Sequence, residues 1–268
     1  MRSAPLVLGV IDGYASEGGY DVPGGIATCY SPAVGLGRVT SPGSGDGLWE
    51  NYVDVFRAAR RAGLDGIALT IEWARVAPRY NVIDVAAWEH YEAMMNSANF
   101  HGLKVSVTVI GNVWPAWLGQ EAWLLPWVEE AFAEHVERVV GRFGERIVSL
   151  RLFARDLIDD GFRRGTIPPW RTRARDDARD ASLAIDRMVA DAVARPEVGS
   201  LIRRVKDVPA SLPADTWSTV LAHRHDYDEI HVATLLPGAG PTVRESSVLR
   251  VVNGELVGEL PSALRRRD

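Results

Sequence analysis

The stretch that decides the fold runs from Gly63 to Pro78 and reads GLDGIALTIEWARVAP. Gly63 follows a helical pattern over residues 49–62 and is suited to end that helix. Residues 66–71 then form an apolar run of strand length, and side chains along a strand alternate between two faces. One face should pack against helices and consists of Ile67, Leu69, Ile71 and Trp73. The other should point toward the axis of a barrel and consists of Ala68, Thr70 and Glu72.

The same alternation of strand and helix recurs along the chain and predicts a mostly parallel sheet. Strands are expected at residues 6–11, 66–71, 104–110, 147–153, 199–204 and 229–234. Helices are expected at 49–62, 85–101, 127–143, 171–194 and 214–223. A Gly-, Pro- and Ser-rich stretch over 13–47 should form a long loop at the mouth of the barrel. The 268 residues fit one (β/α) barrel domain spanning 1–268, since this fold typically takes about 250 residues.

The strand–helix rhythm breaks near the C-terminus. Residues 248–252 and 255–260 have the pattern of two strands, and Asn253-Gly254 between them is typical of a type I′ hairpin turn. No room remains for two further βα units. The expected fold class is therefore α/β and TIM-barrel-like, abbreviated at its C-terminal end and finished by a β-hairpin. An abbreviated barrel exposes strand edges, so the hairpin or a second subunit should cover the gap, and a homodimer is one expectation.

Composition narrows the class of protein. Apolar residues make up 47% and charged residues 24%, which excludes a disordered chain and a membrane protein. The apolar run over residues 5–11 is short and ends at Asp12, so it predicts a buried strand rather than a signal peptide. Cys29 is the single cysteine, which makes a reducing cytoplasm the simplest location. The net charge of −5 argues against nucleic acid as a partner.

Blocks of sequence between Tyr52 and Pro169 resemble the motifs of family 1 glycoside hydrolases in order and in spacing. They are YVDV from Tyr52, the stretch from Gly63 to Pro78, VTVIGNVWP over 107–115, FGERIVSLRLFARD over 143–156 and GFRRGTIPP over 161–169. The resemblance implies a β-glucosidase-like barrel whose ligand is a sugar or glycoside.

The catalytic positions of that family hold different chemistry here. Arg155 aligns with the family's acid/base glutamate, and a guanidinium stays protonated, so it cannot donate a proton to a leaving oxygen. The family's sugar-binding histidine aligns with Gly111, and no TENG nucleophile motif is present. Retaining hydrolysis needs two carboxyl groups about 5 Å apart. The resemblance therefore implies the scaffold without its usual pair of glutamates.

Active sites of these barrels lie at the carboxyl ends of the strands. The catalytic candidates there are the carboxylates of Glu72 and Asp12, with Glu245 from the segment after the sixth strand as a third. Glu72 is either a catalytic or ligand-binding group, or a structural ion-pair partner of Arg151 or Arg155.

Ligand-binding candidates surround these carboxylates, and they are Asn112, Trp114, Arg155, Asp156 and Trp170. Arg155 either clamps an anionic ligand or neutralises Glu72. The indoles at 114, 117, 123 and 127 either stack on sugar rings or form a local hydrophobic cluster. His231 is interpreted as structural. No Cys/His metal spacing or phosphate loop is present, so no metal or cofactor is expected.

Three functions stay open at this point. The first is a diverged glycoside hydrolase-like enzyme that uses Glu72, Asp12 or Glu245. The second is a non-hydrolytic sugar-binding pseudoenzyme. The third is a barrel recruited for other chemistry on an acidic small molecule. Fold alone does not choose among them, because barrels host many reactions.

Overall fold

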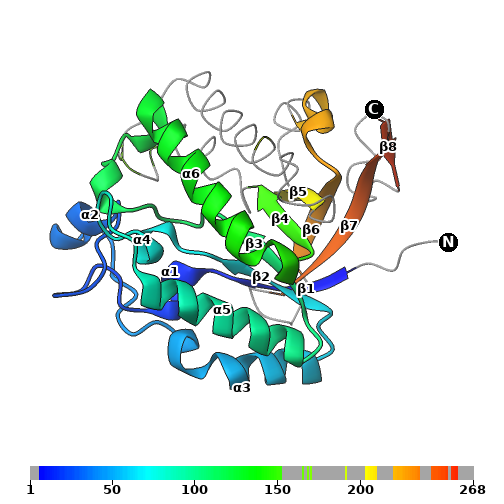
Figure 1. Ribbon diagram of the computed structural model, residues 1–268, viewed down its shortest axis with the longest axis horizontal. Helices are drawn as coiled ribbons and strands as arrows, with labels where there is room; N and C mark the ends of the chain where they lie inside the picture. The colour runs from blue at the N-terminus through cyan, green and yellow to red at the C-terminus, as the bar shows by residue number, and fades with distance from the viewer. Residues whose placement is uncertain are drawn as a thin grey trace.

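The computed structural model describes residues 6–152, 165, 168, 170, 191, 203–209, 220–235, 243–252 and 255–258. Strands and helices alternate along this part of the chain (Figure 1). The parallel strands are β1 (Leu6–Ile11), β2 (Gly66–Thr70), β3 (Lys104–Thr108), β4 (Ser149–Leu152), β5 (Arg203–Pro209) and β6 (Glu229–Leu235). Each pairs with the next, so sequence order and spatial order coincide, as in a barrel.

Helices cover the outside of the first strands (Figure 1). The longer ones are α3 (Leu48–Arg61), α5 (Val85–Phe100) and α6 (Pro126–Phe143), and the short ones are α1 (Gly13–Glu17), α2 (Ser31–Gly35) and α4 (Trp73–Val76). Single 3₁₀ turns lie at Ala116–Leu118, Ala122–Leu124, Gly144–Arg146 and Arg224–Asp226. No helix in the described ranges is both long enough and apolar enough to cross a bilayer.

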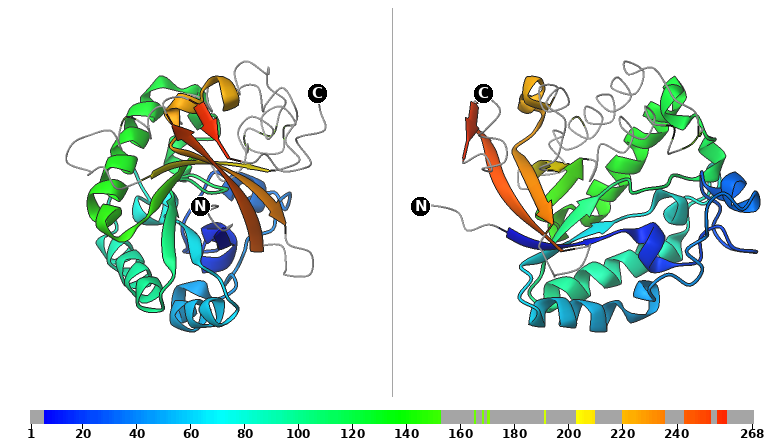
Figure 2. Two further views of the ribbon diagram at one scale, coloured as in Figure 1. Left: turned by 90° about the vertical axis from the view of Figure 1, so that its right-hand side faces the viewer. Right: turned by 180° about the vertical axis from the view of Figure 1, so that it is seen from behind.

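One antiparallel strand connects the two edges of the parallel sheet. β7 (Val243–Val252) pairs with β6 on one side and with β1 on the other, and β8 (Glu255–Val257) extends it as a hairpin. The backbone of Glu245 is the partner of both Val7 and Thr234. Figure 2 shows β7 crossing the sheet beside β6. The expected fold class is confirmed, and the first strand of the hairpin covers the gap that the missing βα units leave.

Several expected boundaries need correction. The fifth strand, expected at 199–204, runs from Arg203 to Pro209 because its ladders with β4 and β6 fall there, on a charged segment without strand-like alternation. β7 begins at Val243, five residues before the expected start, because pairing with β1 extends it. The loop at 13–47 contains α1 and α2. Of the helices expected at 171–194 and 214–223, only Asp191 and residues 220–223 are described; Asp191 and residues 220–222 are helical, and His223 lies in a turn.

The alternation of faces predicted from Gly63–Pro78 is confirmed. Ile67, Leu69, Ile71 and Trp73 lie in the core between the sheet and the helices, and each is almost fully buried. Burial of an aliphatic side chain of this size contributes about 1.5–3 kcal/mol. On the opposite face, the hydroxyls of Ser106 and Ser149 lie 2.7 Å apart across β3 and β4. Small polar side chains therefore line the inside of the sheet.

The double pairing of β7 gives a direct test of the fold. Ser246 pairs with Leu6 of β1 and with Ala233 of β6, so its backbone N–H points at one of two neighbouring strands. Ser246→Pro removes that donor and should lower the free energy of unfolding by at least about 2 kcal/mol. Urea denaturation measures the change, and Ser246→Ala, which keeps the N–H, is the matched control. Equal stability of the two variants would contradict a β7 that is paired on both sides.

Candidate functional site

Polar side chains meet where β1, β2 and β3 end. Asp12 directly follows β1, Glu72 lies two residues after β2, and Asn112 lies four residues after β3. The amide of Asn112 donates a hydrogen bond to the carboxylate of Asp12. The charge of Asp12 in turn acts on the pKa of Glu72. The structure therefore brings together three of the predicted site residues, at the strand ends where barrel active sites lie.

Glu72 is a fully buried carboxyl group. The backbone N–H of Tyr14 donates to its Oε1 atom at 3.1 Å, while Oε2 has no hydrogen-bond partner among the described residues. Burial, followed by the nearby carboxyl groups of Glu17 and Asp12, raises its pKa well above the usual value. The neutral, protonated form of Glu72 is therefore favoured, and its Oε2 atom makes no hydrogen bond to a described residue.

Two glycines create the space for this carboxyl group. A Cβ atom at Gly13 would lie 2.5 Å from Cγ of Glu72, and one at Gly111 would lie 2.7 Å from its Oε1. Neither distance is tolerated between non-bonded atoms, so a larger residue at either position would displace Glu72. Gly111 is the position that aligns with the sugar-binding histidine of the resembling family. Glu72 therefore occupies room that a side chain at residue 111 would need.

A second buried carboxyl group, Glu17, lies beside Glu72. Arg75 donates from Nε to Oε2 of Glu17 at 2.8 Å, and the hydroxyls of Tyr20 and Tyr91 donate to it at 2.5 and 2.7 Å. Burial raises the pKa of Glu17, while the ion pair with Arg75 and these hydroxyls act in the opposite direction. The guanidinium also lies 4.0 Å from the ring centroid of Trp49, a cation–π geometry.

Sequence reasoning missed Glu17 because it lies in a Gly-rich segment without strand or helix periodicity. Its available signal was the spacing to Tyr20 within that segment. Arg75 lay within the quoted stretch but carried no assigned role.

The expected ion pair of Glu72 with a fourth-strand arginine is absent for Arg151. Both side chains are buried, yet no ion pair joins them in the part of the chain that the structure describes. Arg155 and Asp156, the other charged candidates there, lie outside the described residues, as does the side chain of Glu245. The arginine that balances the buried carboxyls comes instead from α4.

The predicted aromatic residues separate into two groups. Trp114 is buried, its Nε1 donates to the carbonyl of Gly119 at 2.7 Å, and it contacts Trp123 edge to face at 5.9 Å. It therefore belongs to a local hydrophobic cluster, with little ring surface for a ligand.

Trp170, in contrast, contacts Tyr30. Its ring centroid is 5.3 Å from that of Tyr30, and its Nε1 has no hydrogen-bond partner among the described residues. Its φ of 61° costs a non-glycine residue about 1–3 kcal/mol, a strain that concentrates at functional sites. Burial, then the electrostatic influence of the Cys29 thiol and of Asp12, raises the pKa of Tyr30, so Tyr30 is close enough to Asp12 for the carboxylate to act on it. Tyr30 was not predicted, because it lay in the supposed loop.

A titratable pair lies inside the sheet on β6. His231 is buried, and its Nε2 lies 2.8 Å from a carboxylate oxygen of Glu229 two residues earlier on β6. Within the described ranges, no group of three or more His, Cys, Asp or Glu side chains could hold a metal ion.

Solved structures similar to this fold include a β-glucosidase and a myrosinase. A β-glucosidase from Thermotoga maritima in complex with castanospermine superimposes with a TM-score of 0.68 at 15% identity, over 85% of this chain and 55% of that one. Aphid myrosinase gives 0.68 at 16% identity, over 85% and 54%. The chain has a glycosidase fold.

Other proteins match more of this chain. The AHE enzyme from Alicyclobacillus herbarius gives a TM-score of 0.67 at 16% identity, over 92% of this chain and 70% of that one. Fpglu1 from Fervidobacterium pennivoraus gives 0.69 at 15% identity, over 92% and 68%. No family model and no curated protein sequence matches the chain. The chain thus shares its fold with these proteins although the sequence identity is low. It spans only about half the length of the β-glucosidase and the myrosinase.

The raised pKa of Glu72 predicts a pH dependence of stability. A folded pKa above the unfolded value of about 4.5 gives stability that is fully present below pH 4.5 and is lost as the pH rises through the folded pKa. In that window one proton contributes a slope of up to about 1.4 kcal/mol per pH unit. Glu72→Gln should therefore flatten the fall in stability between pH 5 and pH 8, measured by urea denaturation. Glu129→Gln, an exposed carboxyl on α6, should leave the slope unchanged. Parallel curves for wild type and Glu72→Gln would mean that Glu72 is ionised in the fold.

Proposed function

We propose that this protein is a diverged relative of family 1 glycoside hydrolases that binds a sugar or glycoside at the carboxyl ends of β1, β2 and β3. The observation that carries the proposal is the half-buried Asp12–Asn112 pair, whose carboxylate acts on Tyr30 of the aromatic pair Tyr30–Trp170. A carboxylate and an amide offer acceptors and donors for hydroxyl groups, and the aromatic faces suit the apolar side of a sugar ring. This combination of an aromatic wall and a few convergent polar groups is typical of small-molecule sites.

Binding without hydrolysis is the favoured form of this function. Glu72 has no exposed surface, so a ligand at the mouth contacts Asp12 and Asn112 rather than Glu72. Glu72 then acts as a positioning residue: it accepts from the backbone of Tyr14, two residues after Asp12, and so supports the ligand-binding edge. Arg155 at the acid/base position cannot supply the proton that a leaving glycosidic oxygen needs.

Turnover is the second candidate, favoured by one observation. Glu72 is a carboxyl group with a raised pKa and an oxygen without a partner, and Asp12 is a second carboxyl group nearby. Pairs of carboxyl groups in different environments are the acid and base of many hydrolases. A movement of the segment around Tyr14 would be needed to bring Glu72 to a substrate. Chemistry on an acidic small molecule depends on Arg155, and only a test with anions addresses it.

We further propose a single domain that works in the cytoplasm. The support is the one cysteine, Cys29, which is buried and free, and whose thiol pKa burial raises well above its usual value. A buried neutral thiol of this kind suits a reducing compartment but does not require one. The proposed sugar site uses only protein side chains and no metal or cofactor. A homodimer stays a prediction, to be checked by light scattering.

The binding function predicts ligand-dependent stabilisation that depends on the mouth residues. Methyl β-glucoside at millimolar concentration should raise the melting temperature of the wild type, because a ligand that binds the folded state alone stabilises it by mass action. Asn112→Ala and Trp170→Ala should each weaken binding about tenfold or more in calorimetric titrations, while Phe100→Ala, an exposed aromatic substitution on α5, should not. Stabilisation by glucose 6-phosphate and not by neutral sugars would instead support the anionic ligand. No shift with any sugar would contradict the proposed site.

The favoured form also predicts an absence of ordinary turnover. Hydrolysis of nitrophenyl β-glucoside should not exceed the no-enzyme rate, because general acid help worth about 10²–10⁴ in rate and a covalent nucleophile are both missing from their family positions. Arg155→Glu should not rescue activity, since it restores one of two required groups. Hydrolysis well above the control and abolished by Glu72→Gln would assign catalysis to Glu72.

A further inference from the structure

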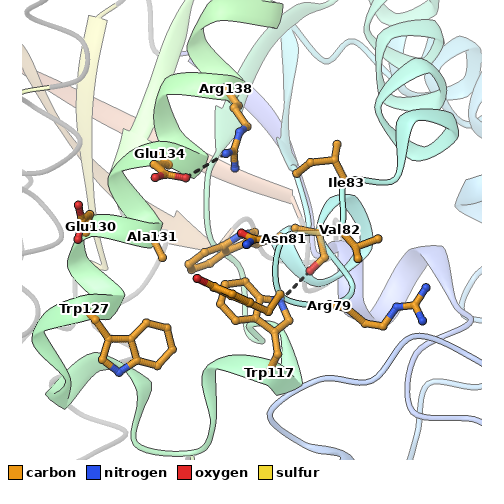
Figure 3. A pocket seen from close by; sticks show the side chains of 13 residues that line it. Arg79, Asn81, Val82, Ile83, Trp117, Trp127, Glu130, Ala131, Glu134 and Arg138 are labelled. Atoms are coloured by element: carbon orange, nitrogen blue, oxygen red, sulfur yellow. Dashed lines mark hydrogen bonds and ion pairs between the residues drawn. The ribbon is translucent and has the colours of Figure 1, made fainter.

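A separate pocket lies on the outer side of the sheet, among the segments that follow β2 and β3 and the start of α6, and none of the mouth candidates lines it. It has a volume of about 380 Å³ and is formed by residues 79–83, by Trp117 and by the first half of α6 (Figure 3). This volume is in the range of about 300–1,000 Å³ that small-molecule sites occupy. Trp73 contributes to its lining, so the chain places Glu72 toward the mouth and the next residue toward this pocket.

Two of the aromatic rings that line the pocket are exposed to solvent. Tyr80 is 68% exposed and Trp127 46% exposed. Aromatic rings of this size stabilise a fold most when they are buried, so their exposure is unusual. Trp117 lies between them, 5.6 Å from Tyr80 and 6.3 Å from Trp127, and its plane is tilted only 29° from that of Trp127. Its Nε1 donates to the carbonyl of Ala77 at 2.9 Å, which fixes the ring (Figure 3). The rings of Tyr80, Trp117 and Trp127 therefore gather at one place in the pocket, and those of Tyr80 and Trp127 are exposed there.

Charged groups border this face without a strong excess of either sign. On α6, Arg138 pairs with Glu134 at 2.9 Å, and Glu130 lies one turn earlier (Figure 3). Arg79 also lines the pocket, so the pocket carries two carboxylates and two guanidinium groups. Such a rim offers hydrogen-bond donors and acceptors but little net attraction for a charged ligand.

We propose that this outer pocket is a second saccharide-binding site, distinct from the mouth. The apolar face of a pyranose ring packs on Trp127 and Tyr80, and its hydroxyls donate to Glu130 and Glu134 and accept from Arg138. A neutral and hydroxyl-rich ligand with an apolar ring face matches both the exposed aromatic rings and the balanced charge. A quaternary ammonium ion would instead need rings on several sides and an excess of carboxylates.

The site is tested by calorimetric titration with cellobiose, maltose and xylobiose in the background of Asn112→Ala, which weakens the mouth. At least one disaccharide should still bind there. Adding Trp127→Ala or Tyr80→Ala should weaken that binding about tenfold or more, and Trp127→Phe should retain part of it, since one factor of ten corresponds to about 1.4 kcal/mol. Phe100→Ala is the matched control, an 86% exposed aromatic that does not line the pocket, and it should change nothing. Circular dichroism of each variant confirms folding.

The outcomes separate this site from the function proposed for the mouth. Binding that is lost with Trp127 but kept in Asn112→Ala supports the outer site, even if the mouth binds no sugar. The outer site is overturned if disaccharide binding is unchanged by Trp127→Ala and Tyr80→Ala, or if none of the three disaccharides binds. Tetramethylammonium binding that depends on Trp127, with no disaccharide bound, overturns the saccharide assignment.

Discussion

The buried ion pair between Arg75 and Glu17 is the interaction on which the candidate site depends. It connects α1, which follows β1, to α4, which follows β2, and both side chains are almost fully removed from water. Removing one partner of such a pair leaves an uncompensated buried charge, a cost of about 3–5 kcal/mol. The hydroxyls of Tyr20 and Tyr91 fill the remaining acceptor positions of Glu17. The start of the 13–47 segment is thus fixed against β2, although its sequence predicts a loop.

This pair also sets the chemistry of Glu72. Arg75, the guanidinium that acts on the pKa of Glu72, is already paired with Glu17, so Glu72 has no ion-pair partner in the described part of the chain and is driven toward its neutral form. A neutral carboxyl group under the polar edge formed by Asp12 and Asn112 can donate a proton or a hydrogen bond, which an ionised one cannot. The same burial that gives Glu72 this property also keeps it from the solvent. For that reason we propose binding at the mouth rather than turnover.

The second constraint is β7, which replaces the βα units that a full barrel would have at this place. A single antiparallel strand satisfies the backbone groups of β1 and β6 together, where two parallel strands with helices would otherwise be needed. The side of the sheet formed by β1 to β3 has the regular strand–helix arrangement of a barrel and carries the candidate site. On the other side β7 joins β6 to β1, and the sequence there holds no TENG motif.

The sequence by itself determined the elements whose local pattern is strong. The strands near residues 6–11 and 66–71, the helices α3 and α5, the hairpin and the inward and outward faces of β2 follow from periodicity, glycines and turn residues. It also placed Asp12, Glu72 and Asn112 at one edge, since parallel strands end together. Only the tertiary structure decided that Arg75 pairs with Glu17, that Trp114 is buried while Tyr30 joins Trp170, and that β7 pairs with β1. Glu17 and Arg75 are 58 residues apart, and β1 and β7 lie at opposite ends of the chain. Such contacts depend on which surfaces the packed helices and strands bring together, and short-range sequence patterns do not determine this.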